Sequence, residues 1–135
     1  MLKALEERRR ERERLLAVAA RYVESLARRA PVHAAAVAGS VARGDFNVWS
    51  DVDVVIVLDE LPETLPERLA LLMADRPAHV QPFGYTGDEL HAALRKGNRL
   101  VAEAVSDGVP VYGGGLATWG ELMRGAGGLA GSSDP

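Results

Sequence analysis

The pattern of apolar residues predicts a long helix at the start of the chain. Residues 3–29 contain neither Gly nor Pro, and apolar side chains recur there at the spacing of one helical face. This apolar stripe lies in the second half of the segment and comprises Leu15, Val18, Ala19, Tyr22, Val23 and Leu26. The second half is therefore expected to pack against a core, whereas the charged first half is expected to project into solvent. Docking of this charged arm on a partner protein is the alternative interpretation.

Four shorter apolar runs predict strands at residues 32–38, 52–58, 79–85 and 109–112. The third run contains Pro82, which favours an edge position or a bulge. Between the last three runs, helical spacing predicts one helix that ends before Pro77 and two more that start near Thr86 and Asn98. Thr86 is followed three residues later by Glu89, the spacing of a capping box. The predicted fold class is α/β (α+β), a small mixed sheet with helices packed on it.

The chain has 135 residues, which is the size of one domain. The pattern of apolar and polar residues divides it into three parts. Residues 1–30 form the N-terminal helix with its charged first half, and residues 31–112 form the core. Residues 113–135 are rich in Gly and are expected to be a flexible tail or linker, with one weak helix between Thr118 and Met123.

Composition narrows the class of protein. Residues 1–30 carry nine Lys and Arg against five Asp and Glu, whereas residues 31–135 carry seven against fourteen. An acidic body argues against direct nucleic-acid binding, and the basic end is interpreted as a solvated helix. The chain has no cysteine, no apolar run near the length of a membrane span and no visible secretory signal. A cytoplasmic protein without a membrane segment is expected.

Candidate chemistry is concentrated between residues 39 and 53. Gly39 and Ser40 end an apolar run of small residues, and such a turn before a short helix presents backbone N–H groups to phosphate. Asp51 and Asp53 alternate along an extended segment, so their carboxylates share one face. Carboxylates held this close favour a hard divalent cation such as Mg²⁺ between them. Metal-assisted nucleotide chemistry is therefore predicted here.

Two aromatic residues, Phe46 and Trp49, flank the loop between the turn and the aspartates. Either ring could line a base pocket. An aromatic side chain in a loop beside a sheet more often covers the core, and this is the expected role of both.

The motif resembles the minimal nucleotidyltransferases of the DNA polymerase beta superfamily, short catalytic modules often paired with HEPN-domain proteins. The pattern G-S-x-A-x-G followed by S-D-x-D is matched at each fixed position, by Gly39, Ser40, Ala42, Gly44, Ser50, Asp51 and Asp53. The resemblance covers roughly residues 15 to 112. It implies the nucleotidyltransferase fold.

The resemblance also implies roles for individual residues. Asp51 and Asp53 would bind Mg²⁺ or Mn²⁺ and act in catalysis. Gly39, Ser40, Arg43 and Ser50 would bind the nucleotide, with Arg43 neutralising phosphate charge. The family's third carboxylate falls at Gln81, which is neutral and cannot act as a base. Asp45, Asp59 or His79 are the candidates to replace it.

The function implied by the resemblance is transfer of AMP from ATP to a hydroxyl of a partner protein. Minimal family members act as antitoxins by adenylylating a tyrosine of a HEPN-domain ribonuclease toxin, so a HEPN-domain partner is expected. From its length of 135 residues, this chain is expected to lack the extra domain that antibiotic-modifying relatives use. The alternative, suggested by Gln81, is a catalytically weak or inactive module that binds nucleotide or neutralises a partner by contact. The oligomeric state is left open, and a homo-oligomer is compatible with the sequence.

Overall fold

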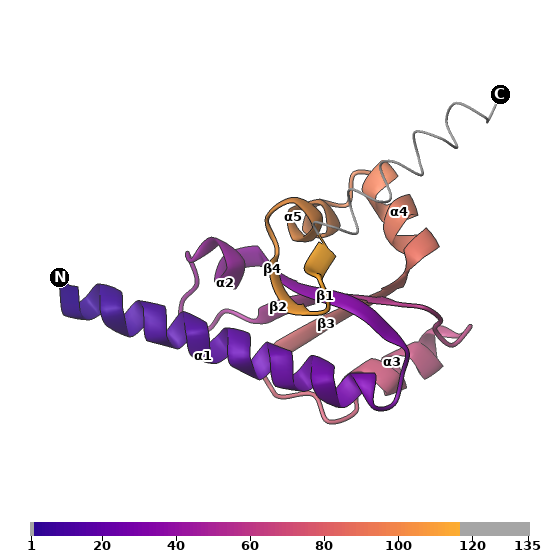
Figure 1. The fold of residues 1–135 in the computed structure, drawn as a ribbon, viewed down its shortest axis with the longest axis horizontal. Coiled ribbons are helices and arrows are strands. Elements are labelled where there is room, and N and C mark those ends of the chain that lie inside the picture. Colours follow the sequence, from indigo (N-terminus) through magenta and orange to yellow (C-terminus); the bar gives the residue numbers. More distant parts are fainter. Residues whose placement is uncertain (1, 117–135) are drawn as a thin grey trace.

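The computed structural model describes residues 2–116. Its four strands form one sheet in the order β3-β2-β1-β4, shown in Figure 1. Strand β1 runs antiparallel to both β2 and β4, whereas β2 and β3 are parallel. The elements are α1 (Leu2–Ala27), β1 (Val32–Ala38), α2 (Gly39–Arg43), β2 (Val52–Leu58), α3 (Leu65–Met73), β3 (Val80–Thr86), α4 (Gly87–Arg95), α5 (Arg99–Asp107) and β4 (Val109–Tyr112). A mixed sheet covered by helices confirms the predicted fold class.

Both faces of the sheet are apolar, because β1 and β2 are continuous runs of Ala, Val, Ile and Leu. One face packs against the predicted stripe of α1 and against Leu72 of α3; its strand residues include Val37, Val54 and Ile56. The opposite face packs against α4 and α5; its strand residues include Ala36, Val55 and Val57. Figure 1 shows α1 and α5 on opposite sides of the sheet.

The predicted boundaries of the later elements are close to those observed. Strand β3 lies at one edge of the sheet, as Pro82 indicated, and its bounds are shifted by one residue from the predicted run. The Thr86 hydroxyl accepts from the Glu89 N–H (3.2 Å), and the Glu89 carboxylate accepts from the Thr86 N–H (2.9 Å), which completes the capping box. The Asn98 side chain caps α5 by accepting from the Val101 N–H at 3.0 Å. The predicted weak helix between Thr118 and Met123 lies outside the described residues.

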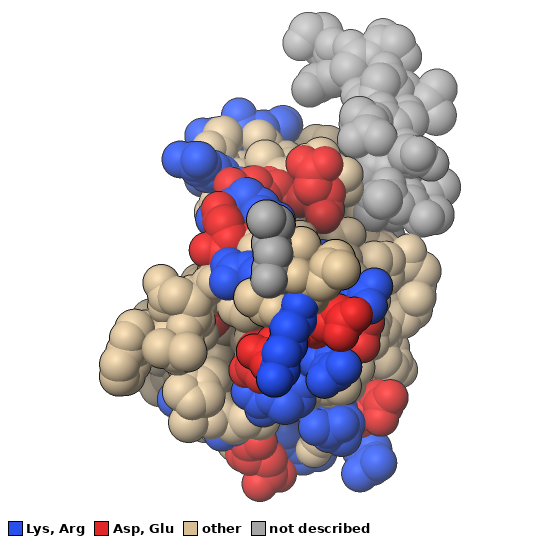
Figure 2. Space-filling model, turned by 90° about the vertical axis from the view of Figure 1, so that its left-hand side faces the viewer, with Lys and Arg blue, Asp and Glu red and all other residues tan. Residues whose placement is uncertain are grey.

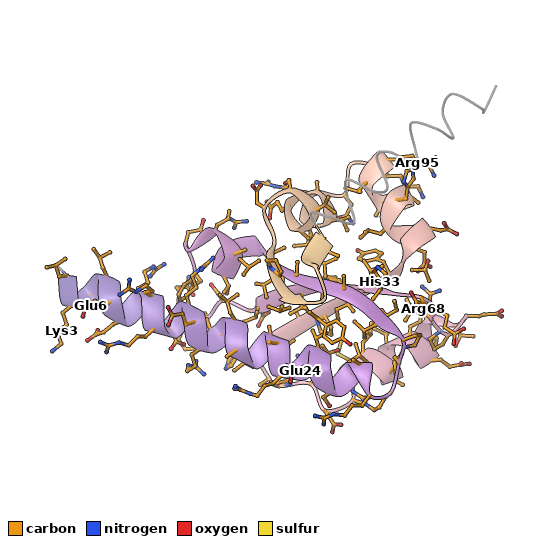
Figure 3. The ribbon with its side chains drawn as sticks, viewed as in Figure 1. Lys3, Glu6, Glu24, His33, Arg68 and Arg95 are labelled. Carbon is orange, nitrogen blue, oxygen red and sulfur yellow. The ribbon has the colours of Figure 1, made fainter. Side chains whose placement is uncertain are left out.

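The charged first half of α1 is not simply solvated. Arg8 donates hydrogen bonds to the carbonyl oxygens of Gly44 (3.0 Å) and Phe46, and its guanidinium carbon lies 4.6 Å from the centroid of the Phe46 ring. Arg12 donates to the carbonyl oxygens of Val41 and Ala42, at 2.9 and 2.8 Å. Two arginines of the arm therefore attach α2 and the loop after it to α1. Figure 3 labels Lys3 and Glu6 on the part of α1 that extends beyond the sheet. Within residues 2–116, no helix combines the length and the apolar character needed to cross a membrane.

Replacing Tyr22 by Phe is expected to lower the free energy of unfolding by about 1 kcal/mol. The Tyr22 hydroxyl is buried in the core and donates a 2.5 Å hydrogen bond to the Leu72 carbonyl oxygen, joining α1 to α3. Burial raises the pKa of Tyr22 from 10.0 to about 12. Because this pKa is raised on folding, the stabilising contribution is complete below pH ~10 and is lost as the pH rises through ~12. Urea unfolding of the wild type and of the Tyr22→Phe protein at pH 8 and pH 11.5 checks this. A difference in unfolding free energy that is the same at both pH values would contradict it.

Candidate active site

The strand register brings three of the predicted residues together at one end of the sheet. Asp53 on β2 pairs with Gln81 on β3 and with Ala38 on β1, and Gly39 follows Ala38 directly. Side chains paired across adjacent strands point to the same face. Since Val55 on β2 points toward α4 and α5, Asp53, two residues earlier, points to that face as well.

The Gly39 turn lies directly under the Asp53 carboxylate. Gly39 has φ of +72°, and a Cβ added there would lie 2.5 Å from Asp53 Oδ2. Only glycine allows both the left-handed backbone and this close approach. The spacing between the Gly-Ser pair and the second aspartate in the sequence therefore corresponds to a contact in space.

The environment of Asp53 favours added positive charge. Burial raises the pKa of Asp53 above its usual value, and the charges of Asp51 and Glu103 raise it further, while Arg43 opposes them. Asp51 is exposed at the start of β2. An ionised pair in this setting gains stability when a cation binds between or beside the carboxylates.

The donor set fits a divalent cation that arrives with a nucleotide. Among residues 2–116, no three His, Asp or Glu side chains converge as a ready-made metal cage. Mg²⁺ is usually held by one or two carboxylates, with oxygens of the substrate phosphates and water completing its shell. Asp51 and Asp53 would supply the carboxylates of such a site.

Helix α2 begins at the Gly-Ser turn with its first N–H groups uncapped. Ala38 is in the N-cap position, so no side chain of the described chain accepts from this end. Uncapped N–H groups at a helix start can donate to an anion. Ser40 is half-buried in this first turn, and Gly44 closes the short helix with φ of +86°. The turn thus offers donors beside the Asp53 carboxylate.

Arg43 is held between two carboxylates. Its guanidinium lies 3.3 Å from Asp45 Oδ2 and 3.0 Å from Glu103 Oε2. A cavity of about 200 Å³ opens here, lined by Ala38, Gly39, Ala42, Arg43, Glu103 and Asp107. Glu103 was not among the predicted site residues, because nothing in a local pattern indicates that α5 crosses the sheet beside the Gly39 turn. For Arg43 to contact phosphate, at least one of these ion pairs has to be exchanged.

Three residues of the loop from Asp45 to Ser50 have predicted roles that can be compared with their positions in the structure. The Ser50 hydroxyl accepts from the Asn47 N–H at 2.9 Å and so stabilises the loop, while its contact with nucleotide stays a prediction. Phe46 is 4% exposed and covers the core as expected. Trp49 is 87% exposed, so the expectation that it covers the core is wrong.

Asp45, Asp59 and His79 were the residues predicted to replace the third carboxylate, and they lie at different distances from Asp53. Asp59 lies beyond the opposite end of β2, next to His33, and is too far along the strand to assist Asp53. Asp45 pairs with Arg43. The backbone carbonyl of His79 accepts from the Val52 N–H at 2.7 Å, which places His79 beside the start of β2. His79 and Asp45 therefore remain near the site, whereas Asp59 does not.

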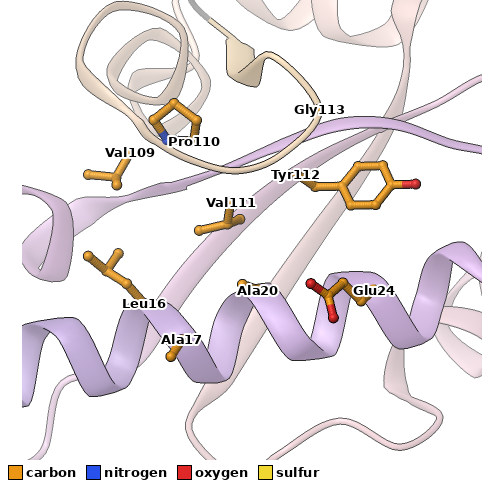
Figure 4. Close-up of a pocket in the computed structure, with 9 residues that line it drawn as sticks. All are labelled: Leu16, Ala17, Ala20, Glu24, Val109, Pro110, Val111, Tyr112 and Gly113. Atoms are coloured by element: carbon orange, nitrogen blue, oxygen red, sulfur yellow. The ribbon is translucent and has the colours of Figure 1, made fainter.

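A hollow larger than the cavity at Arg43 lies away from the candidate active site. It is a shallow groove of about 590 Å³ between α1 and the edge strand β4, drawn in Figure 4. Its walls are mainly apolar, with Leu16 and Ala20 facing Val109 and Val111. This groove is on the face of the sheet opposite to Asp53 and has one acidic residue, Glu24. It lacks the groups that phosphate or metal chemistry requires.

A glycine-serine turn packed under one of two neighbouring aspartates, on a small mixed sheet, is the arrangement of a nucleotidyltransferase. The sequence profile of the nucleotidyltransferase domain matches residues 19–96, which contain the turn, both aspartates and Gln81. The chain belongs to this family. Membership of this family supports nucleotidyl transfer, with a nucleoside triphosphate as substrate.

A solved structure shows the same fold. The chain superposes on a crystal structure from Sulfolobus solfataricus, provisionally assigned as a nucleotidyltransferase, with a TM-score of 0.56 and 20% sequence identity. The match covers 76% of this chain and 84% of that one. No curated protein matches the sequence significantly.

Proposed function

We propose that the protein transfers AMP from ATP to a hydroxyl group of a partner protein, in an antitoxin-like role toward a HEPN-domain toxin. The observation that supports this most is the contact between the Gly39 turn and the Asp53 carboxylate, with Asp51 two residues away. A triphosphate bound at the turn would lie next to carboxylates able to hold its cation. The protein acceptor and the HEPN partner come from the resemblance of the motif.

The reaction forms one bond and breaks one. The acceptor oxygen attacks the α-phosphorus of ATP, and the bond between that phosphorus and the oxygen bridging to the β-phosphate breaks. Pyrophosphate leaves with the electron pair, and the proton of the acceptor hydroxyl passes to a nearby carboxylate or to water. A bound Mg²⁺ or Mn²⁺ would neutralise charge on the entering and leaving oxygens.

The residues of this chain then have separate tasks. Asp51 and Asp53 would hold the cation, and the N–H groups at the start of α2, with the Ser40 hydroxyl, would hold the triphosphate tail. Arg43, released from Glu103 or Asp45, would offset the charge that develops on pyrophosphate.

One observation favours a second candidate function, a module that binds nucleotide or partner without transfer. Gln81 lies beside Asp53 in the strand register, at the position where a third carboxylate would complete the site. An amide oxygen is a neutral ligand and accepts no proton at neutral pH. A protein that keeps the turn and both aspartates but lacks this group could bind a nucleotide and react slowly.

The two functions separate in a transfer assay. The protein is incubated with the product of its neighbouring gene, as the candidate HEPN-domain partner, with Mg²⁺ or Mn²⁺, and with ATP labelled in either the α- or the γ-phosphate. Nucleotidyl transfer places the α-label on the partner and releases the γ-label as pyrophosphate, and it disappears in the Asp51→Asn/Asp53→Asn protein. Complex formation without label on the partner supports the binding module instead.

Replacing Gln81 by Glu is expected to raise the transfer rate by about tenfold to a hundredfold. The new carboxylate would lie beside Asp53, where it can take the proton of the acceptor hydroxyl or hold a cation. Initial rates at saturating ATP measure the effect, and the gain should vanish at a pH low enough to protonate the new group. An unchanged or reduced rate would show that position 81 does not limit turnover.

A further inference from the structure

Three charged side chains form a network at the cavity beside the Gly39 turn. Arg43 Nη1 donates to Glu103 Oε2 at 3.0 Å, and Arg99 Nε lies 3.4 Å from the other carboxylate oxygen, Oε1. Arg43 and Glu103 both line the cavity, which has a volume of about 200 Å³. The metal and nucleotide roles assigned above use Arg43 but give no task to Glu103 or to Arg99.

Packing of α5 fixes the position of Glu103. The opposite side of this helix, which includes Val101 and Ala104, is buried against the sheet, and α5 also contacts α2, the short helix that carries Arg43. The Glu103 side chain is 26% exposed, whereas that of Asp45, the other partner of Arg43, is 63% exposed. The contact with Glu103 is therefore the better shielded of the two ion pairs.

The two partners of Arg43 bind different nitrogens of its guanidinium group. Asp45 Oδ2 accepts from Nε at 3.3 Å, whereas Glu103 accepts from Nη1. Of these two carboxylates, only that of Glu103 belongs to a residue that lines the cavity. An anion that enters the cavity is attracted by Arg43 and repelled by Glu103. It can therefore take the place of Glu103 at Nη1 while Asp45 keeps Nε.

Arg99 lowers the cost of such an exchange. A largely buried carboxylate that loses its partner is left with an uncompensated charge, which destabilises the protein. Glu103 would keep Arg99, which lies one turn earlier on the same helix and contacts the oxygen that Arg43 does not use. The Arg99 side chain is 92% exposed, so it can move closer to Glu103 without disturbing the core.

The surrounding charges make the exchange a local event. Burial, then the charges of Asp51 and Glu103, raise the pKa of Asp53, so Glu103 lies within electrostatic reach of the proposed cation site. Figure 2 views the side of the molecule on which α2 lies and shows basic and acidic side chains next to one another there. Where both signs of charge are mixed, single contacts rather than a broad field select the place at which an anion binds.

We infer that Glu103 occupies Arg43 in the nucleotide-free protein and exchanges it for a phosphate group of the bound nucleoside triphosphate, while Arg99 retains Glu103. This inference rests on the proposed function, because it needs the triphosphate tail to bind at the Gly39 turn. Glu103 is a positioning residue, since it acts through Arg43 and does not touch the nucleotide. Its competition with phosphate sets the affinity of the site for the triphosphate.

The test measures the binding of a non-hydrolysable ATP analogue with Mg²⁺ to the full chain by calorimetry. Glu103→Gln removes the competing charge and keeps the size of the side chain, so it should lower the Kd about fivefold. Asp107→Asn is the matched control, because Asp107 lines the same cavity but its carboxylate accepts from the Ser106 hydroxyl. This control should change the Kd by less than about twofold. In an Arg43→Gln background, the effect of Glu103→Gln should fall to that of the control.

Arg99→Gln tests the second half of the exchange. Without Arg99, the release of Arg43 leaves Glu103 unpaired, so the Kd should rise about threefold. The same change made in the Glu103→Gln protein should have little effect, because no carboxylate is left to retain. A loss of general positive charge would instead raise the Kd equally in both backgrounds and would overturn the inference.

Transfer kinetics give a readout that a purely structural role would not produce. Glu103 competes with phosphate before and during the reaction alike, so Glu103→Gln should lower the KM for ATP and leave kcat within about twofold. Arg43→Gln should raise the KM and lower kcat as well, because Arg43 is proposed to offset charge on the leaving pyrophosphate. A lower kcat in Glu103→Gln would contradict simple competition for Arg43.

The outcomes separate this inference from the proposed function. Transfer with an unchanged Kd in Glu103→Gln, or with equal effects of Glu103→Gln and Asp107→Asn, would overturn the exchange and leave the proposed function intact. Weaker binding by Glu103→Gln would also overturn the exchange, because Glu103 would then support Arg43 rather than compete for it. Tighter binding by this variant, with no transfer by the wild type, would support the exchange and overturn the transferase proposal. A wild type that does not bind the analogue would overturn both.

Discussion

Replacing Asp53 by Asn is expected to abolish transfer, by about a thousandfold or more, while making the nucleotide-free protein more stable. The loss follows because Asn removes the negative charge that would hold the cation against the Gly39 turn. The gain in stability follows from the environment of the carboxylate. Burial, then the charge of Asp51 and that of Glu103, raise the pKa of Asp53 above its usual value.

The sign of the stability effect depends on the direction of that shift. A carboxyl group whose pKa is higher in the folded state stabilises the fold at low pH, and this contribution is lost as the pH rises through the folded pKa. At neutral pH the ionised Asp53 therefore opposes folding when no cation is present. Urea unfolding at pH 7 with a chelator should show Asp53→Asn to be the more stable protein. Lower stability of this variant would show that the carboxylate has a structural partner in the folded state.

Nucleotide and Mg²⁺ should reverse this order, so that the wild type becomes more stable than the Asp53→Asn protein. Mg²⁺ with a non-hydrolysable ATP analogue stabilises the protein that binds it, in proportion to the logarithm of ligand concentration over Kd. The wild type should gain stability, and Asp53→Asn should gain little. Asp59→Asn is the matched control, because Asp59 follows the opposite end of the same strand and its side chain is 69% exposed. It should retain both transfer and ligand stabilisation.

Local chemistry explains which parts of the fold the sequence could predict. The apolar runs defined β1 and β2 because a strand buried on both faces consists of residues such as Val55 and Ile56 throughout. Thr86 and Asn98 predicted the starts of α4 and α5 because a cap is a hydrogen bond within a few residues. The Gly-Ser pair and the aspartates could be joined into one site because their spacing resembles that of a known motif.

Contacts between residues distant in sequence explain what was not predicted. Glu103 reaches Arg43 because α5 packs over the Gly39 end of the sheet, and no local pattern determines that crossing. Arg8 and Arg12 belong to a stretch whose charges suggested solvation, yet they donate to carbonyl groups about thirty or more residues further along the chain. Trp49 looked like a residue that covers the core, and only the loop geometry shows that Phe46 fills that position alone.

Replacing Gly39 by Ala is expected to reduce transfer about a hundredfold or more and to lower the free energy of unfolding by about 1–2 kcal/mol. Two separate effects add here. The φ of +72° is costly for any residue with a Cβ, and the new methyl group would lie 2.5 Å from Asp53 Oδ2, so the carboxylate has to move. A displaced Asp53 can no longer hold a cation beside the phosphate turn.

Gly44→Ala separates the two effects, because Gly44 has an even larger positive φ of +86° but no atom within 4 Å of an added Cβ. Both variants should lose stability in urea unfolding, since both force a side chain into the left-handed region. Gly39→Ala should lose more, because its methyl group also displaces the Asp53 carboxylate. Only Gly39→Ala should also lose Mg²⁺-dependent nucleotide binding, measured by calorimetry. If both variants bound nucleotide equally, the close approach of the turn to Asp53 would have no part in the site, and the assignment of Gly39 to the triphosphate would fail. If only Gly39→Ala fails to bind, the contact between this turn and the carboxylate is what joins phosphate and cation in one site.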